Sequence, residues 1–256
     1  MNTMITFIKK EFIEQVRSRR LLILVLLFVF FGVLNPMTAM LTPYLLELMS
    51  ESLEGSGIII DEVKVSAFDS WIQFFKNLPL ALVAFILLQS SIFSKEYRSG
   101  ALTLVLTKGF ERYKVVVAKL ISLLLLWTIL FYLNFGITYG YTIYLWDNSI
   151  TNNLFFSAFI WWLFGVFVIA IFTIVSTIFI SSSMSLVLCG GIAFGIYLIG
   201  LVPKLTKYFP TLLLDGMSLV SSLKEVNYYL PSILITITLI ISCIVGSIFI
   251  FNKKKL

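Results

Sequence analysis

Six long apolar runs constrain the fold of this chain more than any other feature. A helix that crosses a bilayer needs about 20 mostly apolar residues. Runs of that kind cover approximately residues 21–41, 77–94, 119–145, 154–180, 185–203 and 231–251. Charged residues make up only 12% of the 256 residues and hydrophobic residues 59%, against roughly 25% and 45–50% in soluble domains. We therefore predict an all-α, polytopic integral membrane protein with six transmembrane helices.

Lys and Arg are shared unequally between the two sets of loops. If the N-terminus lies inside, the inner segments hold 14 basic residues and the outer segments hold five. The inner residues are Lys9, Lys10, Arg17, Arg19, Arg20, Lys95, Arg98, Lys108, Arg112, Lys114, Lys119, Lys253, Lys254 and Lys255, and the outer residues are Lys64, Lys76, Lys204, Lys207 and Lys224. Because basic residues in short loops favour the cytoplasmic side, we predict that both termini are cytoplasmic.

The chain divides into two predicted regions, an N-terminal helix over residues 1–20 and a six-span domain over residues 21–256. In the first region the apolar residues Ile5, Ile8, Phe12 and Val16 recur at helical spacing, while charged residues occupy other positions around the helix. This pattern favours an amphipathic helix that lies on the inner membrane surface. The alternative is a basic flank that merely fixes the orientation.

The first outer segment, residues 42–75, is long for a connection between spans. We predict that it folds in part, with a turn over residues 54–57 and the aromatic segment Trp71–Phe75 in the headgroup layer. Pro36 lies inside the first span. Its missing N–H predicts a kink, at which a neighbouring group or water satisfies the freed carbonyl.

Several function classes are excluded or disfavoured by what the sequence lacks. The chain has no histidine, which excludes Ser-His-Asp and Cys-His catalysis and imidazole proton relays. It has no G-x-x-x-x-G-K-[ST] string, so any ATP that drives it must be bound by another chain. The centres of the spans carry no ionisable group, which disfavours ion coupling.

We therefore expect no enzyme activity, cofactor or metal in this chain. The basic residues lie in short clusters between apolar runs, unlike those of a nucleic-acid-binding surface, so we expect no nucleic-acid partner. Cys189 and Cys243 both fall inside apolar runs. They are predicted to be packing residues rather than a disulfide or metal ligands.

Two glycine pairs at helical spacing allow close approach of another backbone. Gly136 and Gly140 in the third span are predicted to pack within the chain. For Gly191 and Gly195 in the fifth span, a subunit interface and packing within the chain are equally favoured.

The inner loop between the second and third spans, residues 95–118, is the most informative connection. It contains the apolar stretch Ala101–Leu106 between Gly100 and Gly109, with charges on both sides. A purely connecting loop would be short and polar. The stretch either forms a short helix that presents a hydrophobic stripe to a cytoplasmic partner or forms an interfacial helix that touches only lipid, and the residues alone leave both open.

This loop and the N-terminal helix resemble those of the permease subunits of type-2 ATP-binding-cassette (ABC) exporters. In that family the first cytoplasmic loop carries a Glu, a Gly four residues later, a Leu-rich turn, an Arg and a Lys. The matching residues here are Glu96, Gly100, Leu104, Leu106, Thr107, Arg112 and Lys119. The segment KEFIEQVRSRRLL at residues 10–22 is similar to the entry helix of the family. The predicted topology resembles that of the family over nearly the whole chain. Similarity at the level of sequence motifs is limited to these two segments.

The resemblance implies an assembly of several chains. This chain would be a permease without ATPase residues, paired with itself or a sister permease in the lipid bilayer and bound by two copies of a cytoplasmic ATPase. Glu96, Gly100, Leu104, Leu106 and Arg112 would couple it to that ATPase.

The resemblance also implies outer re-entrant half-helices within residues 204–230, with Pro203, Pro210 and Pro231 breaking helices at the boundaries. The expected function is export of an amphipathic or hydrophobic substrate, such as a peptide, toxin or antibiotic, across a bacterial plasma membrane. The alternative from another class is a membrane anchor or sensor that does not transport and recruits a cytoplasmic partner through the same loop.

Overall fold

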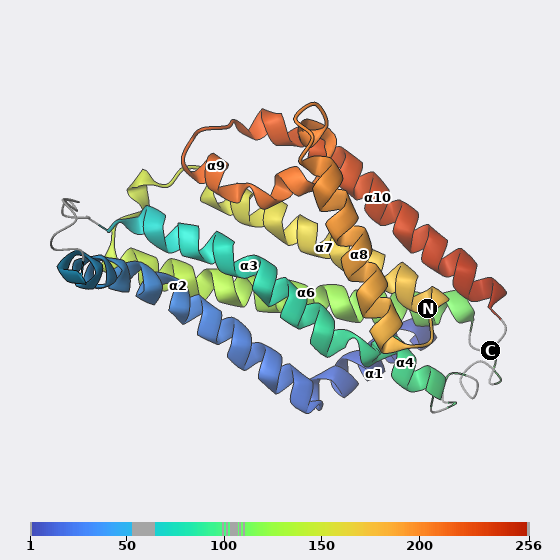
Figure 1. Cartoon of the computed structure of the whole chain (residues 1–256). Helices are drawn as coiled ribbons and strands as arrows, with labels where there is room; N and C mark the ends of the chain where they lie inside the picture. The colour runs from blue at the N-terminus through green and yellow to red at the C-terminus, as the bar shows by residue number, and fades with distance from the viewer. Residues whose placement is uncertain are drawn as a thin grey trace.

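Long helices run side by side along one axis of the molecule (Figure 1). The structure is a computed structural model that describes residues 2–52, 65–98, 100, 102, 107, 109 and 111–254, and those residues contain no β-strand. In chain order the elements are α1 (Asn2–Val16), α2 (Arg19–Ser52), α3 (Ala67–Gln89), α4 (Ser91–Arg98), α6 (Arg112–Leu145), η1 (Asn148–Ile150), α7 (Leu154–Ile178), α8 (Ser182–Gly200), η2 (Thr206–Tyr208), η3 (Pro210–Leu214), α9 (Gly216–Val220) and α10 (Val226–Lys253). Six segments among them are long and apolar enough to cross a membrane, which confirms the predicted all-α, six-span protein.

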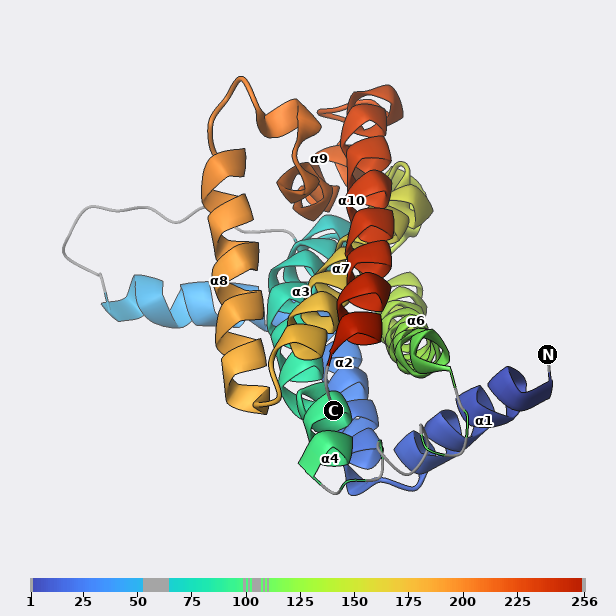
Figure 2. The same cartoon turned by 90° about the vertical axis from the view of Figure 1, so that its right-hand side faces the viewer.

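Helix α7 lies at the centre of the bundle, and α8 lies at its edge (Figure 2). Within the most apolar stretch of each helix, 78% of α7 is buried but only 17% of α8. At the contact between α6 and α7, Gly165 lets the ring of Trp127 approach so closely that a Cβ added at Gly165 would lie 2.3 Å from it. The exposed apolar side chains of α8 require lipid or another protein surface to cover them.

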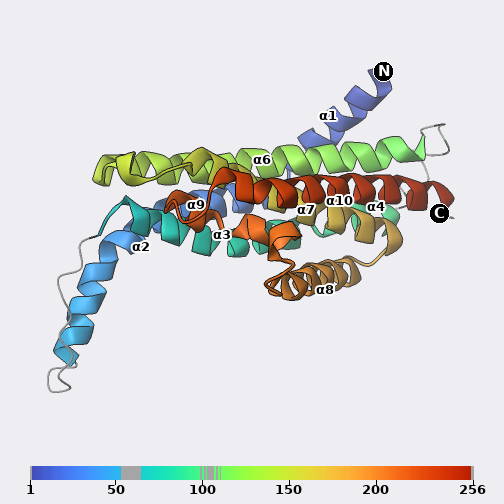
Figure 3. The ribbon, with the colours of Figure 1, turned by 90° about the horizontal axis from the view of Figure 1, so that it is seen from above.

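Helix α2 continues through Pro36 because another helix replaces the hydrogen bond that proline removes. Pro36 has no N–H to donate to the carbonyl of Gly32, four residues earlier. The hydroxyl of Thr138 in α6 donates to that carbonyl at 3.1 Å and accepts a hydrogen bond from Asn35 Nδ2 at 2.9 Å. The predicted replacement of the lost hydrogen bond is thereby confirmed. Farther along, α2 turns away from the bundle, while α1 projects from it elsewhere (Figure 3).

The helices that flank the predicted loop 42–75 extend beyond the apolar runs, so the loop was drawn too long. Helix α2 reaches Ser52 and α3 already begins at Ala67; the predicted turn over residues 54–57 lies outside the described residues. The expected headgroup position of Trp71–Phe75 was wrong, because Trp71 and Phe74 are 0% exposed and pack on Phe135. Helix α3 also contains Lys76, which was counted among the outer residues because it precedes the apolar run 77–94.

Short helical segments between α8 and α10 fold back onto the bundle. Trp161 Nε1 donates to the carbonyl of Leu214 at 3.0 Å, and the hydroxyl of Tyr229 donates to the carbonyl of Asp215 at 2.8 Å. Pro210 begins η3, but Pro231 lies inside α10. The predicted break at Pro231 was therefore wrong: so near the start of α10, proline removes only one bond, to the carbonyl of residue 227.

The prediction for the glycine pair of the third span was also wrong. A Cβ added at Gly136 or Gly140 would meet nothing within 4 Å. Both residues are exposed, and no other described helix packs against them. Helical spacing shows which residues share a face but not which way that face points.

Candidate functional site

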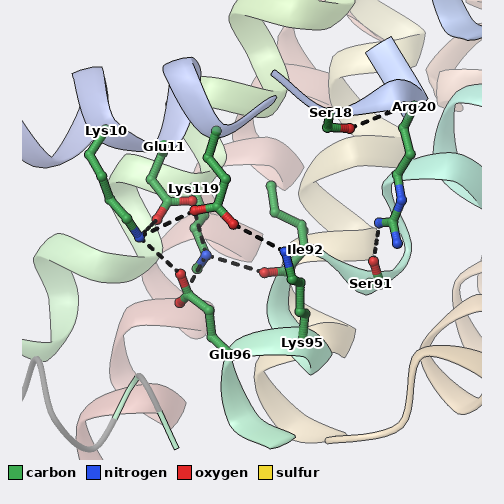
Figure 4. A network of polar contacts seen from close by, with 10 residues as sticks. Lys10, Glu11, Ser18, Arg20, Ser91, Ile92, Lys95, Glu96 and Lys119 are labelled. Atoms are coloured by element: carbon green, nitrogen blue, oxygen red, sulfur yellow. Dashed lines mark hydrogen bonds and ion pairs between the residues drawn. The ribbon is translucent and has the colours of Figure 1, made fainter. Parts of the chain in front are cut away.

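Charged side chains from three helices meet at one end of the bundle. Helix α1, helix α4, the start of α6 and the two chain ends lie at this end (Figure 1). Lys10, Glu11 and Glu14 come from α1, Lys95 and Glu96 from α4, and Lys119 from α6 (Figure 4). We call these six residues the charged cluster.

Lys119 is the centre of the charged cluster, and its side chain is only 2% exposed. Its ammonium Nζ lies 3.0 Å from Glu11 Oε2 and 3.0 Å from Glu96 Oε2, and it donates to the carbonyl of Ile92 at 3.2 Å (Figure 4). A lysine ammonium has three N–H donors, so these three acceptors satisfy it. Removing a charge from water is costly unless the charge is paired and hydrogen-bonded, and Lys119 meets both conditions.

The remaining lysines balance the remaining carboxylate charge. Lys10 Nζ lies 3.1 Å from Glu11, 3.4 Å from Glu96 and 3.5 Å from Glu14, and Lys95 Nζ lies 3.3 Å from Glu14. Three ammonium groups thus face three carboxylates. The oxygens of Glu11, Glu14 and Glu96 are close enough to hold a metal ion, but lysine ammonium groups already bind them.

Two pKa values reflect this arrangement. Burial alone would lower the pKa of Lys10, but the nearby Glu11, Glu96 and Glu14 outweigh it and raise that pKa to about 12. Burial would raise the pKa of Glu14, but Lys10 and Lys95 outweigh it and hold the pKa below its ordinary 4.5. Lys10 and Glu14 are therefore both charged at neutral pH.

A second set of contacts joins the ends of α6, α7 and α10 close to the charged cluster. Arg112, the first residue of α6, donates to the carbonyls of Asn252 and Lys254 at the end of α10. Lys254 Nζ in turn donates to the carbonyls of Thr177 at 2.8 Å and Ile178 at 3.1 Å, where α7 ends. Cations at helix C-termini satisfy free carbonyls and oppose the negative end of the helix dipole. Partial burial lowers the pKa of Lys254.

Comparison with protein families identifies a match over most of the chain. Residues 5–232 match the model of the ABC-2 family transporter proteins. The chain belongs to this family. No match was found among curated proteins. As an ABC-2 family member, the chain is the membrane-spanning permease component of an ABC transporter, a multi-pass protein of the cell membrane that associates with an ABC ATPase.

The permease structure places Glu96 and Arg112, two of the predicted coupling residues, in separate sets of contacts. Glu96 lies in the charged cluster with Lys119, while Arg112 belongs to the neighbouring set of helix-end contacts. Gly100 has φ +67°, a left-handed conformation that favours glycine. Leu104 and Leu106 lie outside the described residues.

The connection between α4 and α6 is shorter than the predicted loop 95–118, because α4 ends at Arg98 and α6 begins at Arg112. Within the predicted apolar stretch, Leu102 is 4% exposed and packs in a small cluster with Val115, Val116 and Phe251. Leu102 therefore fastens this connection to α6 and α10 and is not presented to a partner.

Glu11 belongs to the charged cluster but is not among the residues that the sequence predicted. Glu11 follows Ile8 at helical spacing, so the two residues share the apolar side of α1. A charge on the apolar face of a helix requires a buried partner of opposite sign. That pattern could have drawn attention to Glu11, although nothing local indicates that its partner is Lys119.

Helix α8 of the permease borders an apolar cavity of about 490 Å³ between α3, α7 and α8. Leu82, Trp161 and Leu186 are among the side chains that line it. Gly191 is exposed and Gly195 half-buried, and a Cβ added at either would meet nothing within 4 Å. The free surface at this glycine pair is thus available to a second chain.

Proposed function

We propose that this permease is the membrane half of an ATP-driven exporter and that its ATPase binds the connection between α4 and α6. The observation that most supports this proposal is that charged side chains hold both ends of this connection to other helices. Glu96 binds Lys119 and Lys10 on one side, and Arg112 binds the final carbonyls of α10 on the other. A movement of the connection would therefore be transmitted to α1, α6 and α10 together.

This proposal places the charged end of the bundle in the cytoplasm. The 14-to-five distribution of basic residues supports that orientation. The structure adds that α1, α4 and both chain ends share one end of the bundle (Figure 1), as six spans require.

The proposed substrate is amphipathic or hydrophobic, and the proposed assembly pairs two permeases with two ATPases. The apolar lining of the cavity between α3, α7 and α8 supports the substrate class, since ligand sites of about 300–1,000 Å³ are typically lined in this way. The free surface at Gly191 and Gly195 supports a contact between two permeases, whether identical or sister chains.

The deciding experiment changes the predicted ATPase contact without changing the anchors. Leu104→Ala with Leu106→Ala should release the ATPase or uncouple its ATP hydrolysis from transport, because truncating a buried anchor typically costs more than about 1 kcal/mol of binding. The matched control is Leu230→Ala with Leu234→Ala, two side chains of α10 that are 46% and 66% exposed.

Both double variants should insert normally in the membrane, as judged by their amount in purified membranes. Co-purification of the ATPase and export of a fluorescent amphipathic probe are then compared. Normal binding and export in the Leu104/Leu106 variant would overturn the assignment of this contact. Retained ATPase binding in the unaltered chain without any ATP-dependent transport would instead favour the anchor or sensor.

A further inference from the structure

A pocket of about 250 Å³ opens beside the charged cluster, between the junction of α1 with α2 and the break between α3 and α4. Its lining comprises Glu11, Glu14, Gln15, Ser18, Arg19, Arg20, Gln89, Ser91, Ile92, Lys95, Glu96 and Lys119. A water molecule occupies about 30 Å³ in the liquid. The pocket therefore has room for a chemical group considerably larger than water.

The charges around this pocket leave a positive excess. Every carboxylate in the lining is already paired: Lys119 and Lys10 bind Glu11 and Glu96, and Lys10 and Lys95 bind Glu14. Among the ion pairs of the described residues, none involves Arg19 or Arg20. Within the described part of the chain, the guanidinium of Arg20 donates to one acceptor, the neutral hydroxyl of Ser91, while its backbone N–H donates to Ser18 Oγ (Figure 4). Two guanidinium groups are therefore free to bind an anion.

A buried amide supplies a second, independent indication of a ligand. Gln89 lines the pocket and is only 1% exposed, and its Nε2 has no hydrogen-bond acceptor among the described residues. Burying such a donor without an acceptor is unfavourable. An anionic oxygen in the pocket would satisfy Gln89 Nε2 and both guanidinium groups.

The position of the pocket relative to the spans indicates where that anion comes from. Arg19 is the first residue of the first membrane-crossing segment, so the pocket lies at the level of lipid headgroups. Directly after the arginines, α2 exposes Leu22 and Leu26, along which acyl chains can pack.

We propose that this pocket binds the phosphate group of an anionic phospholipid, with Arg19 and Arg20 as its charge partners and Gln89 Nε2 as a hydrogen-bond donor. The lipid is anionic rather than zwitterionic because the lysines already occupy the carboxylates that a choline or ethanolamine ammonium would need. The bound headgroup joins the start of α2 to the break between α3 and α4. This inference does not depend on the proposed transport function.

The test measures thermal unfolding and native mass spectra of the purified full chain in a mild detergent. Dioleoyl phosphatidylglycerol should raise the unfolding temperature, whereas dioleoyl phosphatidylcholine and inorganic phosphate should have little effect. Arg19→Gln with Arg20→Gln should weaken phosphatidylglycerol binding by roughly tenfold or more, since charge-assisted hydrogen bonds are lost. Gln89→Glu, which places a carboxylate in the pocket, should also weaken it.

Arg17→Gln is the matched control, because Arg17 lies in the connection between α1 and α2, outside the lining, and its substitution removes the same kind of charge. It should retain phosphatidylglycerol binding. Equal binding in the Arg19/Arg20 variant and in Arg17→Gln would overturn the proposal. If phosphatidylcholine raised the unfolding temperature as much as phosphatidylglycerol does, the preference for an anionic lipid would be contradicted. If inorganic phosphate raised it equally, the ligand would be a soluble anion instead of a lipid.

Discussion

Lys119 Nζ and Glu11 Oε2 lie 3.0 Å apart, and their side chains are 2% and 4% exposed. The residues are 108 positions apart in the chain, so this ion pair fastens the N-terminal helix to the third span. A buried ion pair is favourable only while all of its hydrogen-bonding groups are satisfied. The charged cluster is therefore a site at which the loss of a single partner should have large effects.

Lys119→Met should destabilise the protein strongly, because Glu11 and Glu96 then lose a buried partner. Breaking a buried pair in this way typically costs about 3–5 kcal/mol. Adding Glu11→Gln to Lys119→Met should recover part of that loss. Thermal unfolding of the single and double variants in detergent measures the interaction energy between Glu11 and Lys119. Lys114→Met, which breaks the exposed pair with Glu111, is the control and should change the unfolding temperature little; an equal effect of both lysine substitutions would contradict this assignment.

Thr138→Val should destabilise the contact between α2 and α6 by about 1–2 kcal/mol, because the carbonyl of Gly32 loses its donor. Pro36→Ala in the same background should restore part of the stability, since the new N–H at position 36 can donate to Gly32. Thr238→Val is the control, because among the described residues this hydroxyl donates to the carbonyl of Leu234, within its own helix. The prediction fails if Pro36→Ala gives no greater benefit in the Thr138→Val background than in the unaltered chain.

Gly165→Ala should destabilise the bundle by about 1–3 kcal/mol through overpacking, because the added Cβ would collide with the ring of Trp127. Gly140→Ala, where the space is open, should be neutral or slightly stabilising. Unfolding temperatures of the two variants in the same detergent test the difference. Equal tolerance would show that α6 and α7 are not packed as closely as described.

Acid should loosen the attachment of α1. The pKa of Glu14 is lowered when α1 is in place, so this contribution to stability is present above the ordinary pKa of 4.5 and is lost as the pH falls through the lowered value. The pKa of Lys10 is raised to about 12, so its contribution persists up to 10.5 and is lost as the pH rises through about 12. Spin labels at positions 5 and 113 should therefore show a broader distance distribution below pH 4.5 than at pH 7. Glu14→Gln should reduce that change, and an unaltered pH response in this variant would assign it to other groups.

The orientation predicts which engineered cysteines react from outside the cell. In a background of Cys189→Ala with Cys243→Ala, a membrane-impermeant maleimide should modify Leu223→Cys but not Asn252→Cys in intact cells. Both positions are exposed in the structure, so access from the two sides of the membrane decides the result. The reverse labelling pattern would invert the proposed topology.

The six spans could be predicted from sequence because the length and polarity of an apolar run are local properties that the bilayer selects. The same holds for α1, and for the freed carbonyl before Pro36, since proline always removes an N–H. The ends of the helices were less predictable. Helix α3 begins at Ala67 rather than near residue 77, because a helix continues beyond the hydrocarbon layer wherever other contacts support it.

The sequence by itself determined the class of protein and the number of spans, and its family resemblance suggested Glu96, Gly100, Leu104, Leu106 and Arg112 as candidates for coupling. The tertiary structure alone decided which residues are paired. Glu11 meets Lys119, and Thr138 meets the carbonyl of Gly32, across more than 100 residues of chain. It also decided that Gly165 is packed and Gly136 is not. Such pairings depend on how the helices are rotated and placed against one another, which is set by packing over the whole bundle and leaves no signal in any single segment.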